Sequence, residues 1–122
     1  MQNATQIYGN VAKKISGPRE LEANLLLQAA SRLQAAQAPW DRTSPELHSA
    51  LLYNRKLWTI FLTSAMDKDS PLAKNIRQNV ANLGLFVMKQ TMAITGDPQP
   101  EKLAPLININ RELAAGLLGK AA

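Results

Sequence analysis

The apolar residues of this chain recur at helical spacing almost throughout, and proline, glycine and short polar clusters separate the helical stretches. No segment alternates apolar and polar residues as a half-buried strand does. The connections are short, which favours antiparallel neighbours. The predicted fold is therefore an all-α, single-domain, up-and-down bundle of about five helices, at approximately residues 3–15, 18–37, 45–66, 71–95 and 103–118.

Proline and capping residues set the predicted helix boundaries. Thr43 and Glu46 are spaced as a capping box before the third helix. Ser70-Pro71 predicts the start of the fourth helix, and Gly96 predicts its end. Pro105 is tolerated only in the first turn of the last helix, so the start of that helix is the least determined boundary.

The third predicted helix has a broad apolar face. On a wheel of 100° per residue, its core anchors are Leu51, Trp58 and Phe61, and Ile60 widens the face on one side. Asn54 falls among the core anchors, so we expect a buried hydrogen bond there. Arg55 lies off the core face, where it either solvates the helix or clamps a partner carboxylate.

The fourth predicted helix is apolar on two sides. Leu83 and Val87 belong to the predicted core face, and a second face is formed by Leu85, Met88 and Met92. The first or last helix could cover this second face. Alternatively, it is a groove for a partner helix, a role that suits methionine because its side chain adapts to different shapes.

Composition agrees with one soluble domain. The chain has 122 residues, of which 46% are hydrophobic, and it contains no cysteine. Its longest apolar runs are far shorter than the roughly 20 residues that cross a bilayer. The N-terminus opens with polar residues and shows no signal-peptide pattern. The simplest inference is a cytoplasmic protein without disulfides and without a membrane partner.

The basic balance of the chain does not by itself indicate a nucleic-acid site. Net charge is +5 and the sequence pI is about 9.8. The lysines and arginines are scattered, however, and Lys13-Lys14 and Arg55-Lys56 are the only adjacent basic pairs. This pattern favours a solvated surface over a binding site for nucleic acid.

Reactive side chains are not gathered anywhere along the sequence. His48 is the only histidine, and no cysteine or carboxylate cluster at ligand spacing accompanies it. There is no phosphate-binding loop, nucleophile elbow or dinucleotide fingerprint. The sequence therefore predicts no catalytic residue, no metal site and no cofactor, and it favours a binding protein over an enzyme.

Three segments resemble one known family. Residues 50–61 (Ala-Leu-Leu-Tyr-Asn-Arg-Lys-Leu-Trp-Thr-Ile-Phe) are similar to the signature helix of the FlaF family, flagellar biosynthesis regulators of alphaproteobacteria. Residues 82–89 and 106–117 also resemble that family, as do Ala4 and Tyr8 and the Arg19–Glu22 start of the second helix. The resemblance covers nearly the whole chain in order.

The resemblance implies a small, helical, non-catalytic protein that controls flagellin production or export together with a second regulator, FlbT. Flagellin and FlbT are therefore the expected partners. The leading hypothesis is that the protein holds an amphipathic flagellin helix against an apolar surface, and the candidate contact residues from the wheels are Leu85, Met88, Met92 and Arg55. The alternative is a regulator that binds flagellin messenger RNA, which the basic balance permits.

Overall fold

The computed structural model describes residues 17–70 and 72–119. Within these ranges the chain forms four α-helices and one short 3-10 helix, and no strand. The elements are α2 (Pro18–Gln37), α3 (Pro45–Met66), α4 (Lys74–Gly96), η1 (Pro100–Leu103) and α5 (Ala104–Leu117). The all-α prediction is confirmed, and the helix predicted over residues 3–15 lies outside the described residues.

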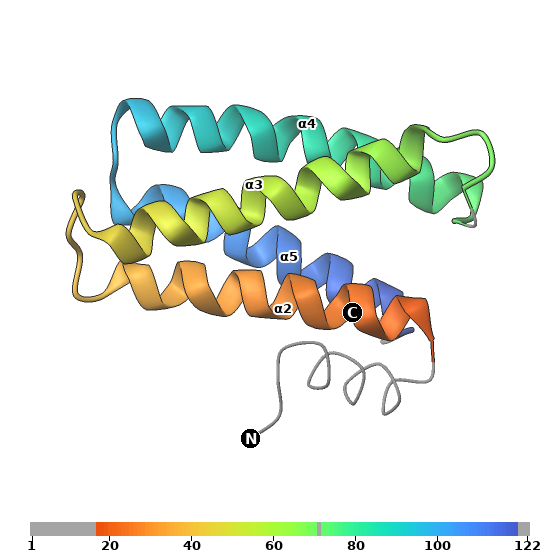
Figure 1. Cartoon of the computed structure of the whole chain (residues 1–122), viewed down its shortest axis with the longest axis horizontal. Coiled ribbons are helices and arrows are strands. Elements are labelled where there is room, and N and C mark those ends of the chain that lie inside the picture. Colours follow the sequence, from red (N-terminus) through yellow and green to blue (C-terminus); the bar gives the residue numbers. More distant parts are fainter. Residues whose placement is uncertain (1–16, 71, 120–122) are drawn as a thin grey trace, which may run out of the picture.

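The four helices run alternately up and down, as expected from the short connections (Figure 1). The most extensive packing joins α2 to α5, and α3 packs against both α2 and α4. In contrast, α4 makes few contacts with α5. One long side of α4 is therefore held by α3, and α4 and α5 meet along a loose seam.

The start of α3 differs by one residue from the predicted capping box. Ser44, not Thr43, is the N-cap, and its Oγ accepts a hydrogen bond of 2.9 Å from the Leu47 backbone N–H. The Thr43 hydroxyl instead donates to the Asp41 carboxylate at 2.7 Å. The cause is Pro45, which takes the first helical position and keeps the residue before it extended.

Helix α4 begins at Lys74, later than the predicted start at residue 71. The Ser70 backbone N–H donates to the Asp67 carbonyl, and the Ser70 Oγ accepts from the Leu72 N–H. These bonds close a turn instead of capping a helix, so the prediction from Ser70-Pro71 was wrong. Gly96 ends the helix as expected.

The last helix is preceded by a separate 3-10 turn. The predicted start at residue 103 falls on the last residue of η1, and α5 runs from Ala104 with Pro105 in its first turn. Pro100 opens η1 in the same way, because its fixed φ suits a first helical position.

The core anchors predicted for α3 and α4 are in the interior, with one exception. Trp58 and Val87 are fully enclosed, and Leu51 and Phe61 are buried beside them. Leu83 is half-buried because it lies at the α4–α5 seam, where it lines a depression with α5 residues. The placement of Ile60 at the edge of the core was wrong, because its side chain is 64% exposed.

A buried chain of hydrogen bonds crosses the middle of the bundle from α3 to α5. The Trp58 Nε1–H donates to Asn110 Oδ1 at 2.8 Å, and Asn110 Nδ2 donates to Asn54 Oδ1 at 2.7 Å. All three side chains are fully buried. The hydrogen bond expected at Asn54 is confirmed, and this layer fixes the register of α3 against α5.

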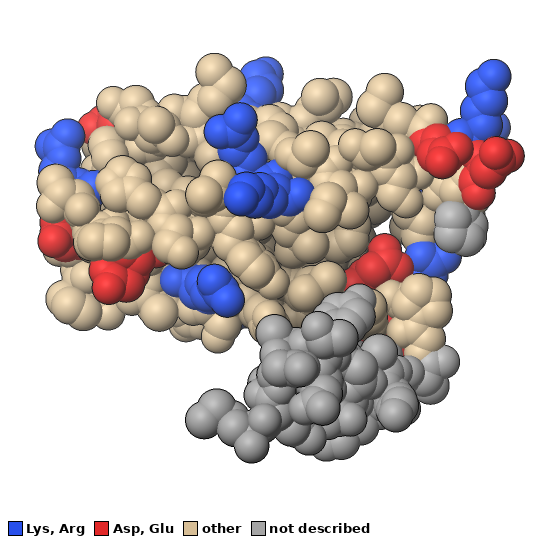
Figure 2. Space-filling view, in the orientation of Figure 1, with Lys and Arg blue, Asp and Glu red and all other residues tan. Residues whose placement is uncertain are grey.

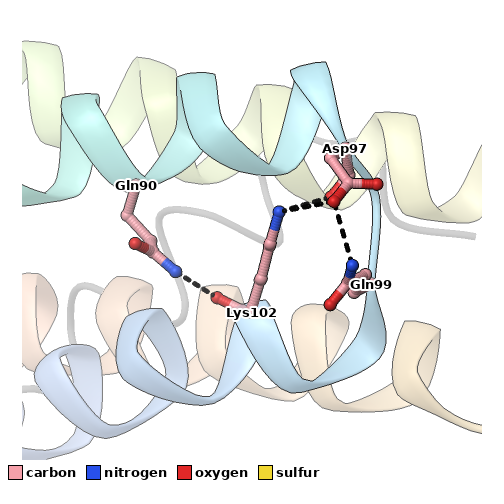
Figure 3. Close-up of polar contacts among 4 residues, drawn as sticks. All are labelled: Gln90, Asp97, Gln99 and Lys102. Carbon is pink, nitrogen blue, oxygen red and sulfur yellow. Dashed lines mark hydrogen bonds and ion pairs between the residues drawn. The ribbon is translucent and has the colours of Figure 1, made fainter.

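Polar contacts also fix the end of α4 against η1 (Figure 3). The Lys102 ammonium donates to the Asp97 backbone carbonyl at 2.8 Å and lies 3.2 Å from the Asp97 carboxylate. Seven residues before Asp97, on α4, Gln90 Nε2 donates to the Lys102 carbonyl at 2.8 Å. These bonds hold the C-terminal half of α4 against η1, in the connection between α4 and α5.

At Gly84, helix α4 packs closely against α3. A Cβ atom at this position would lie 2.4 Å from Leu62 Cδ2 and 2.6 Å from Leu62 Cγ. Such distances are far below ordinary van der Waals contact, so the absence of a side chain lets the two helices pack tightly. Leu62 is half-buried at this contact.

Replacing Gly84 with valine is expected to lower the free energy of unfolding by about 1–3 kcal/mol, because overpacking forces the two helices apart or Leu62 out of its rotamer. Urea unfolding followed by circular dichroism measures the change. Adding Leu62→Ala to the Gly84→Val variant should recover part of the lost stability, since it removes the clashing atoms. Equal stability of Gly84→Val and the natural chain would show that the approach is not tight.

Candidate protein-binding face

The second apolar face of α4 is open in the structure. Leu85 is 63% exposed and Met92 is 74% exposed, whereas Met88 is half-buried. Helix α5 therefore does not cover Leu85 or Met92, and the first predicted helix, the other candidate to cover them, lies outside the described residues. These two large apolar side chains stand in solvent on a helix whose other side is packed in the core.

Three of the four candidate contact residues lie at one depression between α3 and α4. It has a volume of about 540 Å³, and Arg55 of α3 lines it together with Met88 and Met92 of α4. Thr91, Thr95 and Gly96 complete the lining. Leu85 lies outside the depression but on the same side of α4, because it precedes Met88 and Met92 by three and seven residues.

A second depression, of about 480 Å³, adjoins the first along α3 and shares Arg55 with it. Its lining includes Leu52 and Ile60, which are 49% and 64% exposed. The two depressions and Leu85 together are called the α3–α4 face below. Its large apolar residues are Leu52, Ile60, Leu85, Met88 and Met92.

Leu52 and Ile60 were not among the residues predicted for binding. Both lie on the solvent side of α3, and Lys56 stands between them at four-residue spacing. The sequence carried a signal for them, because Leu52 and Ile60 fall about 120° and 160° from Trp58 on the wheel. That signal was weak, since single exposed apolar residues are common on any surface.

The threonines that line the α3–α4 face are less polar than their residue type indicates, because their hydroxyl groups are bonded within their own helices. The Thr91 hydroxyl donates to the Val87 carbonyl at 2.7 Å, and the Thr95 hydroxyl donates to the Thr91 carbonyl at 2.9 Å. On α3, the Thr59 hydroxyl donates to the Arg55 carbonyl at 2.8 Å. Because each hydroxyl proton is used within its own helix, these side chains place little demand on a partner for hydrogen bonds.

The charge on this face has one sign. Arg55 and Lys56 contribute from α3, and Lys89 lies on α4 between Leu85 and Met92. Helix α4 contains no aspartate or glutamate, and the only acidic residue of α3 is Glu46, which lines a separate depression with Arg32. In Figure 2, basic side chains stand in the middle of the molecule and also at both ends, whereas the acidic ones lie only toward its ends.

Two carboxyl groups with a displaced pKa lie away from the face. Burial raises the pKa of Glu22 at the start of α2, and the neighbouring Arg19 opposes that rise. Hydrogen bonds from the Thr43 backbone and hydroxyl lower the pKa of Asp41 in the connection before α3. Neither group is placed to act on a molecule bound between α3 and α4.

The described residues hold no group of three or more histidine, cysteine or carboxylate side chains that could bind a metal ion. His48 is exposed in the first turns of α3. In residues 17–70 and 72–119, no helix combines the length and hydrophobicity that crossing a bilayer requires. What the arrangement offers is an apolar, cationic surface built on two firmly packed helices.

Comparison with known proteins shows that residues 4–117 match the family model described as "Flagellar protein FlaF". No match was found among curated proteins or among solved structures. The family match includes all of α2, α3, α4 and α5, and thus both helices of the α3–α4 face. It confirms the resemblance seen in the sequence, and the chain belongs to the FlaF family of flagellar proteins.

Proposed function

We propose that this protein binds flagellin in the cytoplasm, as an export chaperone does, and thereby regulates flagellin synthesis or export together with FlbT. It acts by binding, without catalysis. The family places the chain among flagellar proteins. The observation that carries the proposal is the α3–α4 face, where Leu85 and Met92 are exposed beside Met88 and Arg55.

Flagellin supplies a suitable ligand on physical grounds. Its terminal segments pack as helices in the filament, so before assembly they present apolar helix faces. A chaperone that covers these faces prevents premature association. The α3–α4 face fits this task because helix-in-groove binding uses apolar anchors at three- and four-residue spacing, as at Leu85, Met88 and Met92.

The energy available at the face is sufficient for specific binding. Complete burial of a leucine, isoleucine or methionine side chain contributes up to about 1.5–3 kcal/mol. Five such side chains are available, of which Met88 is already partly covered. Since association itself has a substantial entropic cost, an affinity in the micromolar range is a reasonable expectation.

Binding to flagellin messenger RNA receives less support. Basic side chains in Figure 2 stand in separate groups and form no continuous stripe along which a phosphate backbone could lie. The exposed aromatic among the described residues is Phe86, which lies on α4 away from Leu85 and Met92, so these residues offer no stacking platform of several rings.

Isothermal titration calorimetry with soluble flagellin tests the proposal, using the intact chain alone and then with FlbT. Saturable binding in either arm supports it. Failure of flagellin to bind in both arms would refute direct recognition. A gel-shift titration with flagellin messenger RNA across salt concentrations serves as the competing arm, because phosphate-driven binding weakens steeply as salt rises.

A further inference from the structure

The α3–α4 face is positively charged as well as apolar, and its charge defines the chemistry of the partner. Arg55 stands where the two depressions meet, so its guanidinium borders both apolar surfaces. Lys56 lies beside it on α3, and Lys89 lies one turn from both Leu85 and Met92 on α4. Arg55 and Lys56 therefore line the depressions, and Lys89 stands outside both of them on the exposed side of α4.

These cations are available to a partner. Within the described residues, no ion pair involves Arg55, Lys56 or Lys89, and all three side chains are exposed. The acidic residue of α3, Glu46, lies more than two turns before Arg55, and α4 has none. A ligand on this face thus meets positive charge that the protein itself does not neutralise.

The shape of the face favours a helix over a flat surface. Two depressions flank Arg55, and the ridge of side chains along a helix fits into such hollows. The distance along α4 from Leu85 to Thr95 is about 15 Å at 1.5 Å per residue, which equals roughly three helical turns. A partner of this length presents apolar residues at i, i+3, i+4 and i+7.

We infer that the α3–α4 face selects an amphipathic helix whose apolar stripe is bordered by glutamate or aspartate. This inference rests on the proposed function, because it names the class of flagellin segment that the face recognises. Carboxylates on both flanks of the stripe reach Arg55 and Lys56 on one side and Lys89 on the other. A helix with lysines on its flanks meets the same cations and is rejected.

Three synthetic helical peptides of about 18 residues test the inference. They share one leucine stripe at i, i+3, i+4 and i+7, and their flanking positions carry glutamate, glutamine or lysine. Fluorescence anisotropy with the full chain gives each Kd at low salt. We expect the glutamate peptide to bind about tenfold more tightly than the glutamine peptide and the lysine peptide to bind most weakly, because each exposed ion pair contributes modestly.

Variants that lack these basic side chains provide the matched control. Arg55→Gln combined with Lys89→Gln should greatly reduce the preference for glutamate over glutamine, and Lys68→Gln, in the turn after α3, should leave it unchanged. High salt should reduce the preference of the natural chain in the same way. Equal affinity for the glutamate and glutamine peptides would overturn the inference.

The peptide experiment and the flagellin experiment can fail independently of each other. If flagellin binds but the three peptides show no charge preference, the inference fails and the proposed function stands. If the glutamate peptide binds through Arg55 and Lys89 but flagellin does not, the flagellin assignment fails instead. Binding of vesicles that contain an anionic lipid, without binding of the glutamate peptide, would show that the face is a membrane surface and would overturn the inference.

Discussion

Replacing Trp58 with alanine is expected to lower the free energy of unfolding by about 3–5 kcal/mol, the largest loss from any single substitution considered. Trp58 is fully buried, packs edge-to-face on Phe61 with ring centroids 5.8 Å apart, and donates a hydrogen bond to Asn110. Its removal leaves a large cavity and an unpaired buried acceptor. Because a domain of this size is stable by only about 5–15 kcal/mol, the variant should be close to unfolding.

Urea unfolding by circular dichroism measures this loss, and Trp58→Phe separates its two causes. Phenylalanine keeps much of the packing but cannot donate to Asn110, so it should cost clearly less than alanine. Trp40 offers a comparison elsewhere in the chain, since it is half-buried in the connection before α3. A loss below about 1 kcal/mol for Trp58→Ala would mean that the buried layer does not hold the bundle together.

Replacing Leu85 and Met92 together with glutamate is expected to weaken flagellin binding on the order of 100-fold. Both side chains are exposed, so the free protein tolerates the charges, whereas a bound apolar helix would bury them. The added charges would also repel an acid-flanked helix. Calorimetric titration with soluble flagellin measures the change in affinity, and circular dichroism verifies that helicity is retained.

Met66 provides the matched control for this double variant. It is 76% exposed, nearly the same as Met92, and it is the last residue of α3, three helical turns after Arg55 and outside both depressions. Met66→Glu should leave flagellin affinity unchanged. Equal loss of affinity in the control and in the double variant would indicate a non-specific effect of charge and contradict the assignment of the face.

Much of the fold could be predicted from the sequence because each helix carries its own periodic apolar stripe. The bounds of α2 and α3 match those expected, since Pro18 and Pro45 each mark a first turn. The starts of α4 and α5 could not be predicted as closely. Ser70 closes a local turn and η1 precedes Pro105, and both depend on contacts between neighbouring backbone groups that a periodic pattern does not contain.

The candidate site could be predicted only in part. The wheel grouped Leu85, Met88 and Met92, because that grouping depends on one helix alone. It could not place Arg55 beside Met88 and Met92, because their proximity depends on how α3 packs against α4. Nor could the wheel predict whether these α4 side chains are covered or exposed, since this depends on where α5 lies. The loose α4–α5 seam is a tertiary feature that no helical pattern specifies.

Methionine methyl groups allow the central claim to be tested within a single sample. The chain has four methionines, and two of them, Met88 and Met92, lie at the proposed binding face, while the exposed Met66 lies elsewhere. With ¹³C-labelled methionine methyl groups, NMR spectra are recorded as unlabelled soluble flagellin is added. We predict that the Met88 and Met92 signals shift or broaden to saturation and that the Met66 signal stays in place. Flagellin binding that moves Met66 while leaving Met88 and Met92 unchanged would contradict the assignment of the α3–α4 face.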